Sequence, residues 1–167
     1  FLYAGLMIDA NGEPSVIEFN CRFGDPEAQP VLSRLRSDLV DACEAALRGE
    51  VDAVELEFDP RVAVGVVLAA EGYPGAVKKG AAIAGLDAVA ALEDVKVFHA
   101  GTARDAADVL RTNGGRVLCV VALGDDIAAA RTRQRKRRAR VAARSESRSV
   151  GSPHDPSRTD RVGQGRC

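Results

Sequence analysis

The sequence predicts an α+β protein in which a β-hairpin and a helix precede a small, mostly β domain and a basic tail. Three observations support this fold class. Apolar residues make up 46% of the 167-residue chain, which is enough for a packed core. Apolar runs rich in Val, Ile and Phe alternate with Gly, Pro and Asn, as strands and their turns do. The end of the chain is instead crowded with arginine, so we do not expect it to join the core.

The beginning of the chain predicts a hairpin followed by a loop. Residues 1–9 and 15–20 are apolar enough to form strands. Between them, Asn-Gly within residues 10–13 accepts the positive φ that a tight turn requires. Residues 22–30 contain one glycine and two prolines, which favour a loop over regular structure.

A helix is expected next, from residue 37 or 38 to Arg48. Apolar side chains recur there at helical spacing, and Gly49 stands where a helix C-cap belongs. An acidic, irregular stretch then ends at Pro60. We place the boundary between the first and second parts of the chain there, at residues 59–60.

The second part predicts mostly strands. They are expected at residues 62–69, 95–100 and 116–123, with a mixed strand and turn at 102–112. A glycine-rich stretch separates the first two. A helix is expected to begin at residues 124–126, because an aspartate there can cap exposed amide groups.

The net charge of −1 conceals a strong asymmetry along the chain. Residues 131–167 carry twelve of the 23 lysines and arginines but only three of the 24 acidic residues. This tail could bind nucleic acid through phosphate neutralisation, or it could be a solvated, disordered extension. A reading-frame shift near residue 131 is the third interpretation. We favour it because the change is abrupt and interrupts the apolar pattern of the last helix.

Several classes of protein are disfavoured by composition. No apolar run approaches the length of a membrane span, and the start lacks the basic region of a signal peptide. The four cysteines match no zinc spacing, which favours free thiols in a reducing compartment. We therefore expect a soluble, cytoplasmic protein without a membrane partner.

The segment Glu18-Phe19-Asn20 is the first candidate functional site. Alternate residues of a strand point to one face, so Glu18 and Asn20 would present a carboxylate and an amide oxygen together while Phe19 turns into the core. Such hard oxygen ligands suit Mg²⁺, which completes its coordination with water and phosphate oxygens. The alternative is an edge strand with two solvated polar residues.

The loop that follows gathers one cation and two carboxylates around a glycine and a proline. Arg22 could hold a phosphate or a carboxylate through its planar fork. Gly24 permits an unusual backbone angle or the close approach of a ligand, and Asp25 and Glu27 flank the stiffening Pro26. A surface turn with its own ion pair is the alternative.

Residues 16–29, VIEFNCRFGDPEAQ, resemble the signature region of phosphoribosylamine–glycine ligases, a family within the ATP-grasp superfamily. The resemblance covers about residues 1–130. It continues in VVLAAEGYPG at 66–75, FHAGT at 98–102 and TNGGRVL at 112–118. The sequence departs from the family pattern at Ala28, where threonine is commoner, and modestly at Ala70-Glu71 and residues 76–78.

The resemblance implies a reaction and a role for each candidate residue. ATP, 5-phosphoribosylamine and glycine would give ADP, phosphate and glycinamide ribonucleotide through a phosphorylated glycine carboxylate, a step of purine biosynthesis. Glu18 and Asn20 would be the Mg²⁺ or Mn²⁺ ligands. Arg22 would contact phosphate or a substrate carboxylate, while Asp25 and Glu27 would shape the pocket for glycine and phosphoribosylamine.

The resemblance also implies a domain organisation. Residues 1–59 would be the end of an ATP-grasp domain, residues 60–130 the family's C-terminal domain, and residues 131–167 a disordered or frame-shifted tail. The N-terminal domain and most of the ATP-binding part would be missing, so we expect no activity from this chain alone. The full-length family is expected to be monomeric and cytoplasmic, with no nucleic acid among its partners.

Two other functions stay open at this point. One is another ATP-grasp enzyme, either a different carboxylate–amine ligase or a biotin carboxylase-like protein, which the run from Arg22 to Gln29 disfavours. The other is a nucleic-acid-binding module driven by the basic tail, which the acidic first part of the chain does not support.

Overall fold

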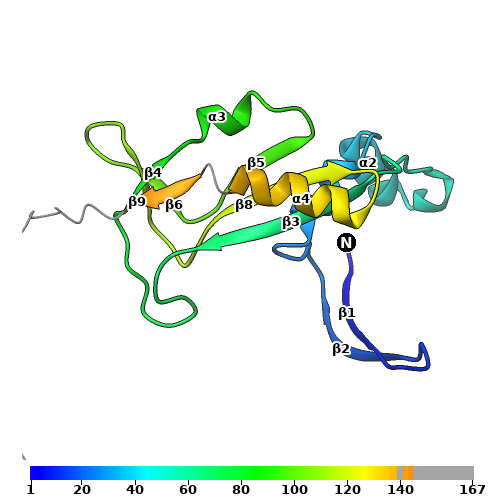
Figure 1. Ribbon diagram of the computed structural model, residues 1–167. Coiled ribbons are helices and arrows are strands. Elements are labelled where there is room, and N and C mark those ends of the chain that lie inside the picture. The colour runs from blue at the N-terminus through cyan, green and yellow to red at the C-terminus, as the bar shows by residue number, and fades with distance from the viewer. Residues whose placement is uncertain (139–140, 145–167) are drawn as a thin grey trace, which may run out of the picture.

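The structure is a computed structural model that describes residues 1–138 and 141–144. Within these ranges the strands form one two-stranded, one three-stranded and one four-stranded sheet. Figure 1 shows that the two-stranded hairpin projects from a body built by the other sheets and the helices. This arrangement agrees with the α+β class predicted from the sequence. None of the helices in the described ranges has the length and hydrophobicity that crossing a bilayer requires.

The hairpin consists of strands β1 (Tyr3–Ile8) and β2 (Pro14–Asn20), which pair antiparallel. Asp9 closes the turn, since its Oδ1 atom accepts hydrogen bonds from the backbone N–H groups of Asn11 at 2.8 Å and Glu13 at 2.9 Å. Gly12 has a φ of 90°, the conformation that made Asn-Gly a turn signal. The predicted hairpin is confirmed.

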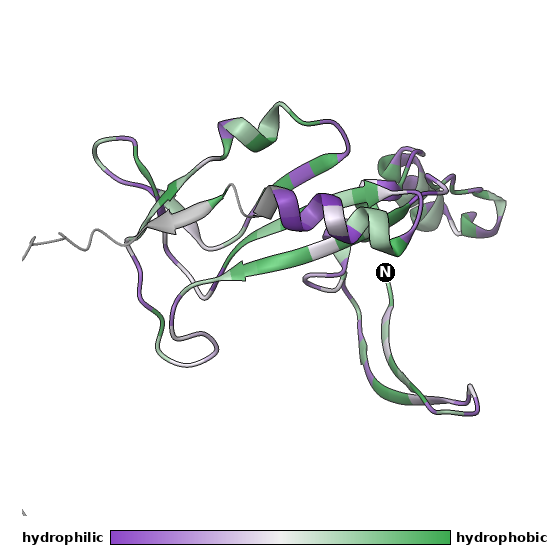
Figure 2. Cartoon of the chain, viewed as in Figure 1, coloured by the Kyte–Doolittle hydropathy of each residue, from purple (hydrophilic) through white to green (hydrophobic). Residues whose placement is uncertain are grey.

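The three-stranded sheet holds most of the core. Strand β8 (Arg116–Gly124) lies between β3 (Val62–Ala69) and β5 (Val95–His99), and both pairings are antiparallel. Each side chain of residues 117–123 is buried because β8 has a neighbour on both edges and helices over the sheet. Figure 2 shows these strands as mainly hydrophobic, as the apolar runs in the sequence predicted.

The four-stranded sheet was largely missed by the sequence patterns. Its strands, in spatial order, are β6 (Thr102–Arg104), β7 (Leu110–Thr112), β4 (Ala82–Ala84) and β9 (Ala142–Arg144). Each has three residues, which is too short for an alternating pattern to stand out. The short helix α3 (Asp87–Ala90) follows β4, and its Val89 is fully buried in the core.

Two helices connect the hairpin to the core sheet. Helix α2 (Leu39–Arg48) confirms the predicted helix: Asp38 caps it by accepting from the Val40 N–H at 2.8 Å, and Gly49 closes it in the left-handed conformation. A single 3₁₀ turn, η1 (Val51–Ala53), follows it.

Helix α1 (Ala28–Arg34) corrects the prediction of a loop through residue 30. Pro30 is the third residue of this helix. Backbone N–H groups in a first turn have no partner within the helix, so a proline there removes no hydrogen bond. The proline therefore marked a helix start and not a loop.

Helix α4 (Ile127–Arg138) also extends beyond the expected limit of the folded part at residue 130. Gln134 on this helix is 1% exposed, and strand β9 pairs with β4 in an antiparallel register that places Arg144 opposite Ala82. The basic sequence after residue 130 thus continues the helix, and Figure 2 shows α4 changing from a hydrophobic start to a hydrophilic stretch. Residues 139–140 and 145–167 lie outside the described ranges, so the disordered or frame-shifted character expected of them stays a prediction.

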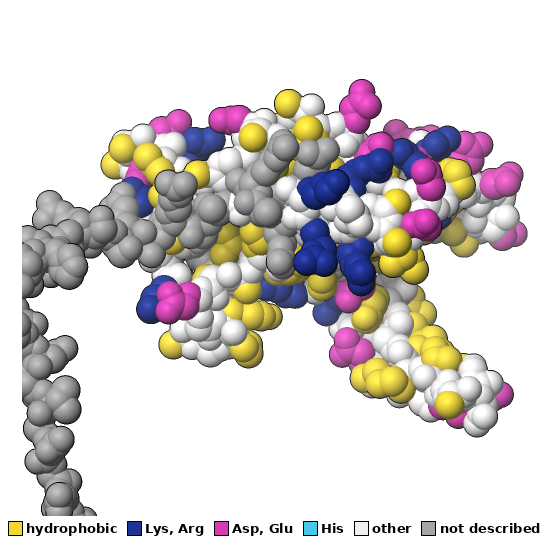
Figure 3. Space-filling model, viewed as in Figure 1, with side chains coloured by type: hydrophobic (Ala, Val, Ile, Leu, Met, Phe, Trp, Pro, Cys, Tyr) yellow, Lys and Arg dark blue, Asp and Glu magenta, His cyan; other side chains and the backbone are white. Residues whose placement is uncertain are grey.

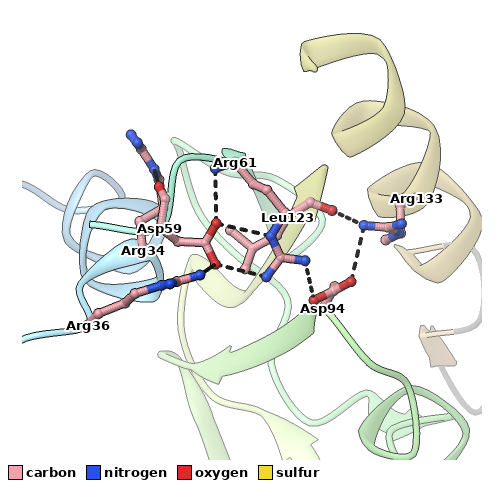
Figure 4. Close-up of polar contacts among 7 residues, drawn as sticks. All are labelled: Arg34, Arg36, Asp59, Arg61, Asp94, Leu123 and Arg133. Carbon is pink, nitrogen blue, oxygen red and sulfur yellow. Dashed lines mark hydrogen bonds and ion pairs between the residues drawn. The ribbon is translucent and has the colours of Figure 1, made fainter. Parts of the chain in front are cut away.

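A cluster of charged side chains links the connecting segment, which runs from the end of α1 to the start of β3, to the core sheet (Figure 4). The buried Asp59 accepts from the Arg61 Nε and Nη2 atoms at 3.0 and 2.9 Å and from the Arg36 Nη2 atom at 3.1 Å. Arg61 also donates to Asp94 at 2.7 Å, and Arg133 of α4 pairs with the same carboxylate. The cluster therefore brings together the segment after α1, the residues just before β3 and β5, and the middle of α4.

Burial in β8 predicts a large difference between two identical substitutions. Leu118 is 2% exposed, whereas Leu47 on α2 is 89% exposed. Leu118→Ala should reduce the free energy of unfolding by about 2–5 kcal/mol, because it removes buried methyl groups and leaves a cavity. Leu47→Ala should change it by less than about 0.5 kcal/mol. Denaturant unfolding of the two variants checks this, and similar losses would show that β8 is not the core.

The environment of Asp59 predicts a dependence of stability on pH. Hydrogen bonds from Arg61, followed by that from Arg36, hold the pKa of Asp59 well below its usual range. Its contribution is therefore present above the unfolded pKa of about 3.9 and is lost as the pH falls through the lower folded pKa. Asp59→Asn should destabilise the protein at neutral pH, and the gap from the parent should narrow below about pH 4.

The control for this measurement is Asp52→Asn, which changes an exposed aspartate in η1. Unfolding midpoints are measured from pH 7 to the lowest pH at which the parent remains folded. A gap between Asp59→Asn and the parent that stays constant over this range would contradict the assigned pKa direction.

Candidate active site

Glu18 and Asn20 lie near the end of β2 that is farthest from the hairpin turn. They pair with Gly5 and Tyr3 of β1, respectively. The pairing is regular here, so alternation along the strand places both side chains on one face of the hairpin. Gly5 leaves room for Glu18, because a Cβ atom at Gly5 would lie 3.2 Å from the Glu18 Cγ atom. The sequence therefore builds a small open surface around the carboxylate.

The opposite face of the hairpin does not match the expectation. Phe19 is 60% exposed, so the prediction that it turns into the core is wrong for the described chain. The hairpin has two strands and lies apart from the core sheet, and no described layer covers the face that carries Phe19 (Figure 1). The alternation of side chains along the strand predicts which face carries Phe19, but it does not show whether another layer covers that face.

The pair fits a divalent cation as a partial ligand set. The Asn20 Nδ2 atom is buried and has no hydrogen-bond partner among the described residues. Because the oxygen and nitrogen of an amide are interchangeable by rotation, this position can equally hold an oxygen that binds a cation. No described group of three or more His, Cys, Asp or Glu side chains could hold a metal. Glu18 and Asn20 would thus supply two oxygens, and water or phosphate the rest.

Gly24 serves a steric purpose in the loop after β2. A Cβ atom at Gly24 would lie 2.4 Å from the Glu27 Oε2 atom and 2.9 Å from the Glu27 Cβ atom. The backbone carbonyl of Gly24 also accepts from the Ala28 N–H at 2.9 Å, which starts helix α1. The close contact at this glycine is therefore with a neighbouring side chain, and the approach of a ligand there stays a prediction.

Arg22 and Glu27 share a cavity of about 220 Å³ with the first residues of the chain. Its walls are otherwise mainly apolar and include Phe1 and Phe23, whose ring centroids are 4.2 Å apart. Arg22 donates from Nη1 to the Phe23 carbonyl at 2.9 Å, and its exposed guanidinium has further donors. The structure thus brings together two of the three predicted loop residues.

Asp25 points elsewhere and is engaged by the core sheet. Its Oδ2 atom lies 3.2 Å from Nη2 of Arg116, and its backbone carbonyl accepts from Arg116 Nη1 at 2.6 Å. Gln29 donates to its Oδ1 atom at 3.1 Å. Asp25 is not among the residues that line the Arg22 cavity. Sequence reasoning missed this contact of Arg116, which it placed at the start of a strand and within the run TNGGRVL at 112–118.

Helix α1 holds this loop against the sheet. Pro30 lies over Gly65 of β3, since a Cβ atom at Gly65 would be 3.4 Å from the Pro30 Cδ atom. The same position would be 3.5 Å from the Cys119 sulfur on β8. Pro30 can therefore pack close to both β3 and β8 because residue 65 has no side chain.

The three described cysteines should differ sharply in reactivity. Cys21 is exposed, Cys43 is half-buried and Cys119 is buried. Burial, with a smaller effect of the negative charge of Asp25, raises the pKa of Cys119 and lowers its thiolate fraction. In the native protein near pH 8, a maleimide should label Cys21 at least about tenfold faster than Cys119. Peptide mass spectrometry locates the labels, and equal rates would contradict this burial.

Comparison with known proteins identifies the surroundings of this site. The family model described as "Phosphoribosylglycinamide synthetase, C domain" matches residues 63–148. The model described as "Phosphoribosylglycinamide synthetase, ATP-grasp (A) domain" matches residues 1–28, which include the five candidate residues.

Related proteins carry the same name. A phosphoribosylamine–glycine ligase of Neisseria meningitidis serogroup A is 63% identical over 134 residues, which are 80% of this chain and 31% of that protein. One of Xylella fastidiosa is 61% identical over 130 residues, or 78% of this chain and 29% of that protein. The chain thus spans less than a third of the length of these relatives.

Solved structures agree with this relationship. A phosphoribosylamine–glycine ligase from Thermotoga maritima matches with a TM-score of 0.63 and 33% identity, over 84% of this chain and 34% of that one. An N5-carboxyaminoimidazole ribonucleotide synthetase from the same organism matches at 0.57 with 17% identity, over 87% and 37% of the two chains, and shows the fold alone. Because the C-domain match covers more than half of its residues, the chain belongs to the phosphoribosylglycinamide synthetase family.

Proposed function

We propose that this chain is the carboxy-terminal part of a ligase that joins glycine to 5-phosphoribosylamine and converts ATP to ADP and phosphate. The observation that carries the proposal is the arrangement at the end of β2. An oxygen pair on one strand face is followed directly by a loop that places an arginine and a glutamate at one cavity. The names of the relatives and the residue run from Arg22 to Gln29 support this reaction over other ATP-dependent ligations.

Glu18 and Asn20 are the proposed metal ligands. A bound Mg²⁺ or Mn²⁺ would supply charge neutralisation for the phosphoryl group that passes from ATP to the glycine carboxylate. Glu18 contributes the negative charge and Asn20 a neutral oxygen. Their place on a paired strand fixes the spacing between them, which a loop would leave variable.

Arg22 is proposed to bind the substrate carboxylate or a phosphate. A guanidinium has five N–H donors in a planar fork, and the Phe23 carbonyl engages Nη1 at 2.9 Å. Its other N–H donors can make a charge-assisted contact with a carboxylate or phosphate bound at the cavity, whose walls are mainly apolar. Glu27 at the same cavity offers a carboxylate for the amine of glycine or phosphoribosylamine.

We also propose the division of the chain near residue 60 into the end of an ATP-grasp domain, at residues 1–59, and the family's C-terminal domain, whose model matches residues 63–148. The hairpin supports a larger assembly, because it exposes a set of large apolar side chains: Leu6, Met7, Ile8, Val16, Ile17 and Phe19. Figure 3 shows apolar side chains along this projection. Such surface is usually covered in a complete protein.

The remainder of the ATP site and the substrate site would then lie in the part of the protein that precedes this segment. The chain of 167 residues alone is proposed to be inactive. The proposed setting is the cytoplasm, and the proposed ligands are glycine, 5-phosphoribosylamine, ATP and a divalent cation.

A chimera tests this function. The 134 residues of this chain that match the Neisseria meningitidis ligase at 63% identity replace the matching segment of that ligase. We expect the chimera to form glycinamide ribonucleotide and ADP from glycine, phosphoribosylamine and ATP, and the isolated chain to form neither. A stable, folded chimera without turnover would refute the proposed function.

The metal assignment predicts a specific defect in the chimera. Glu18→Gln removes the charged ligand and should weaken the apparent Mg²⁺ affinity by at least about tenfold, since even the loss of a residue that merely supports a ligand costs about 10–100-fold. Glu13→Gln, at the hairpin turn, removes an exposed carboxylate near β2 and should leave this affinity unchanged. Titration of activity with Mg²⁺, together with direct Mn²⁺ binding by electron paramagnetic resonance, measures both. Equal behaviour of the two variants would remove Glu18 from the site.

A further inference from the structure

We propose that Arg116 is a positioning residue, through which the core sheet holds the loop that carries Arg22 and Glu27. The inference rests on the proposed function, because it assigns a purpose to the geometry of that loop. Arg116 is separated from Asp25 by 91 positions in the sequence, yet it makes two polar contacts with it.

The two contacts fix orientation as well as distance. Arg116 Nη1 donates to the Asp25 carbonyl at 2.6 Å, and Nη2 lies 3.2 Å from Asp25 Oδ2. One planar guanidinium thus contacts both the main chain and the side chain of a single residue. Because the guanidinium is rigid, the peptide of Asp25 cannot rotate without losing one of the contacts.

Arg116 is itself held by the sheet. It is the first residue of β8, and the N–H of Gly101 donates to its carbonyl at 2.8 Å. The preceding carbonyl, of Gly115, accepts from the Ala70 N–H at 2.8 Å. The next seven residues are buried, so the backbone at Arg116 continues directly into the most buried strand.

The contacts with Asp25 can affect the cavity because Asp25 lies between Gly24 and Glu27, which both line it. Gln29 holds the other oxygen of Asp25 at 3.1 Å, and the Gly24 carbonyl accepts from the Ala28 N–H at 2.9 Å. A fixed Asp25 therefore fixes both the carbonyl that starts α1 and the direction of the Glu27 side chain. Arg116 does not line the cavity, which makes it a positioning residue and not a catalytic one.

Stability does not account for this contact. The side chains of Arg116 and Asp25 are 40% and 52% exposed, and ion pairs with this exposure contribute little to folding. A substitution should therefore disorder the loop while the fold stays intact. This separates the proposal from a merely structural role.

The first test uses the chain itself and needs no turnover. With Cys43 and Cys167 replaced by serine, a nitroxide is attached to Cys21, next to Arg22. Arg116→Gln should increase the mobility of this label in electron paramagnetic resonance spectra, with an unchanged unfolding midpoint, and Arg116→Lys should restore part of the order. The matched control is Arg104→Gln, because Arg104 likewise contacts the carbonyl and carboxylate of one residue, Asp108, at 2.8 and 3.2 Å.

The second test uses the active chimera. Arg116→Gln should lower kcat/KM for glycine or phosphoribosylamine by about two- to fivefold, because loss of an exposed ion pair can shift the population of the ordered loop by no more than about that factor. The KM for ATP should stay unchanged, Arg116→Lys should recover part of the loss, and Arg104→Gln should match the parent.

The outcomes separate the two proposals. Label mobility in Arg116→Gln equal to that in Arg104→Gln would overturn the positioning role, as would a mobile label with unchanged kinetics. An inactive parent chimera would refute the proposed function, and the label measurement would still decide whether Arg116 holds the loop.

Discussion

The packing of helix α1 on the core sheet is the contact on which the arrangement of this molecule depends. Pro30 can lie over β3 because residue 65 is a glycine, and a Cβ atom there would already touch the proline ring. This contact brings the loop after β2 within reach of Arg116 at the start of β8. The loop is thus held to the sheet by this small-residue contact and by Arg116, while the Asp59 cluster holds the segment that follows α1.

Apolar packing stabilises the interior of the core sheet, and charge pairing stabilises the junction between this sheet and the connecting segment. The interior of the sheet is almost purely aliphatic, and β8 runs through its centre with neighbours on both edges. Where the connecting segment returns to the sheet, the buried Asp59 gathers two arginines (Figure 4). A buried carboxylate is costly unless it is fully hydrogen-bonded, and here each oxygen has more than one donor. The charge cluster therefore specifies a geometry that aliphatic packing alone would leave loose.

The sequence predicted those parts of the fold in which neighbouring residues decide the outcome. The hairpin follows from Asn-Gly at its turn, helix α2 from Asp38 and Gly49 at its ends, and β8 from a continuous apolar run. Helix α1 was missed because Pro30 suggested a loop, although a first turn tolerates proline. Strands of three residues carry no readable period.

The candidate site divides in the same way. Strand alternation could predict that Glu18 and Asn20 share a face, and the resemblance could name the loop residues. No local pattern could show that Asp25 is engaged by an arginine 91 positions away, since that contact exists solely in the tertiary structure. For the same reason the sequence placed Phe19 in a core: a period of two gives a direction, whereas the covering layer has to come from elsewhere.

The uncovered hairpin has a consequence for handling the isolated protein. Strand β1 pairs with β2 on one side, and its other edge has no described strand beside it. Unpaired amide groups next to side chains such as Met7 and Ile8 offer a template on which a second molecule can add a strand. Concentrated solutions should accordingly be prone to self-association, and a short lysine-rich solubility tag or a charged substitution on that edge is the natural remedy.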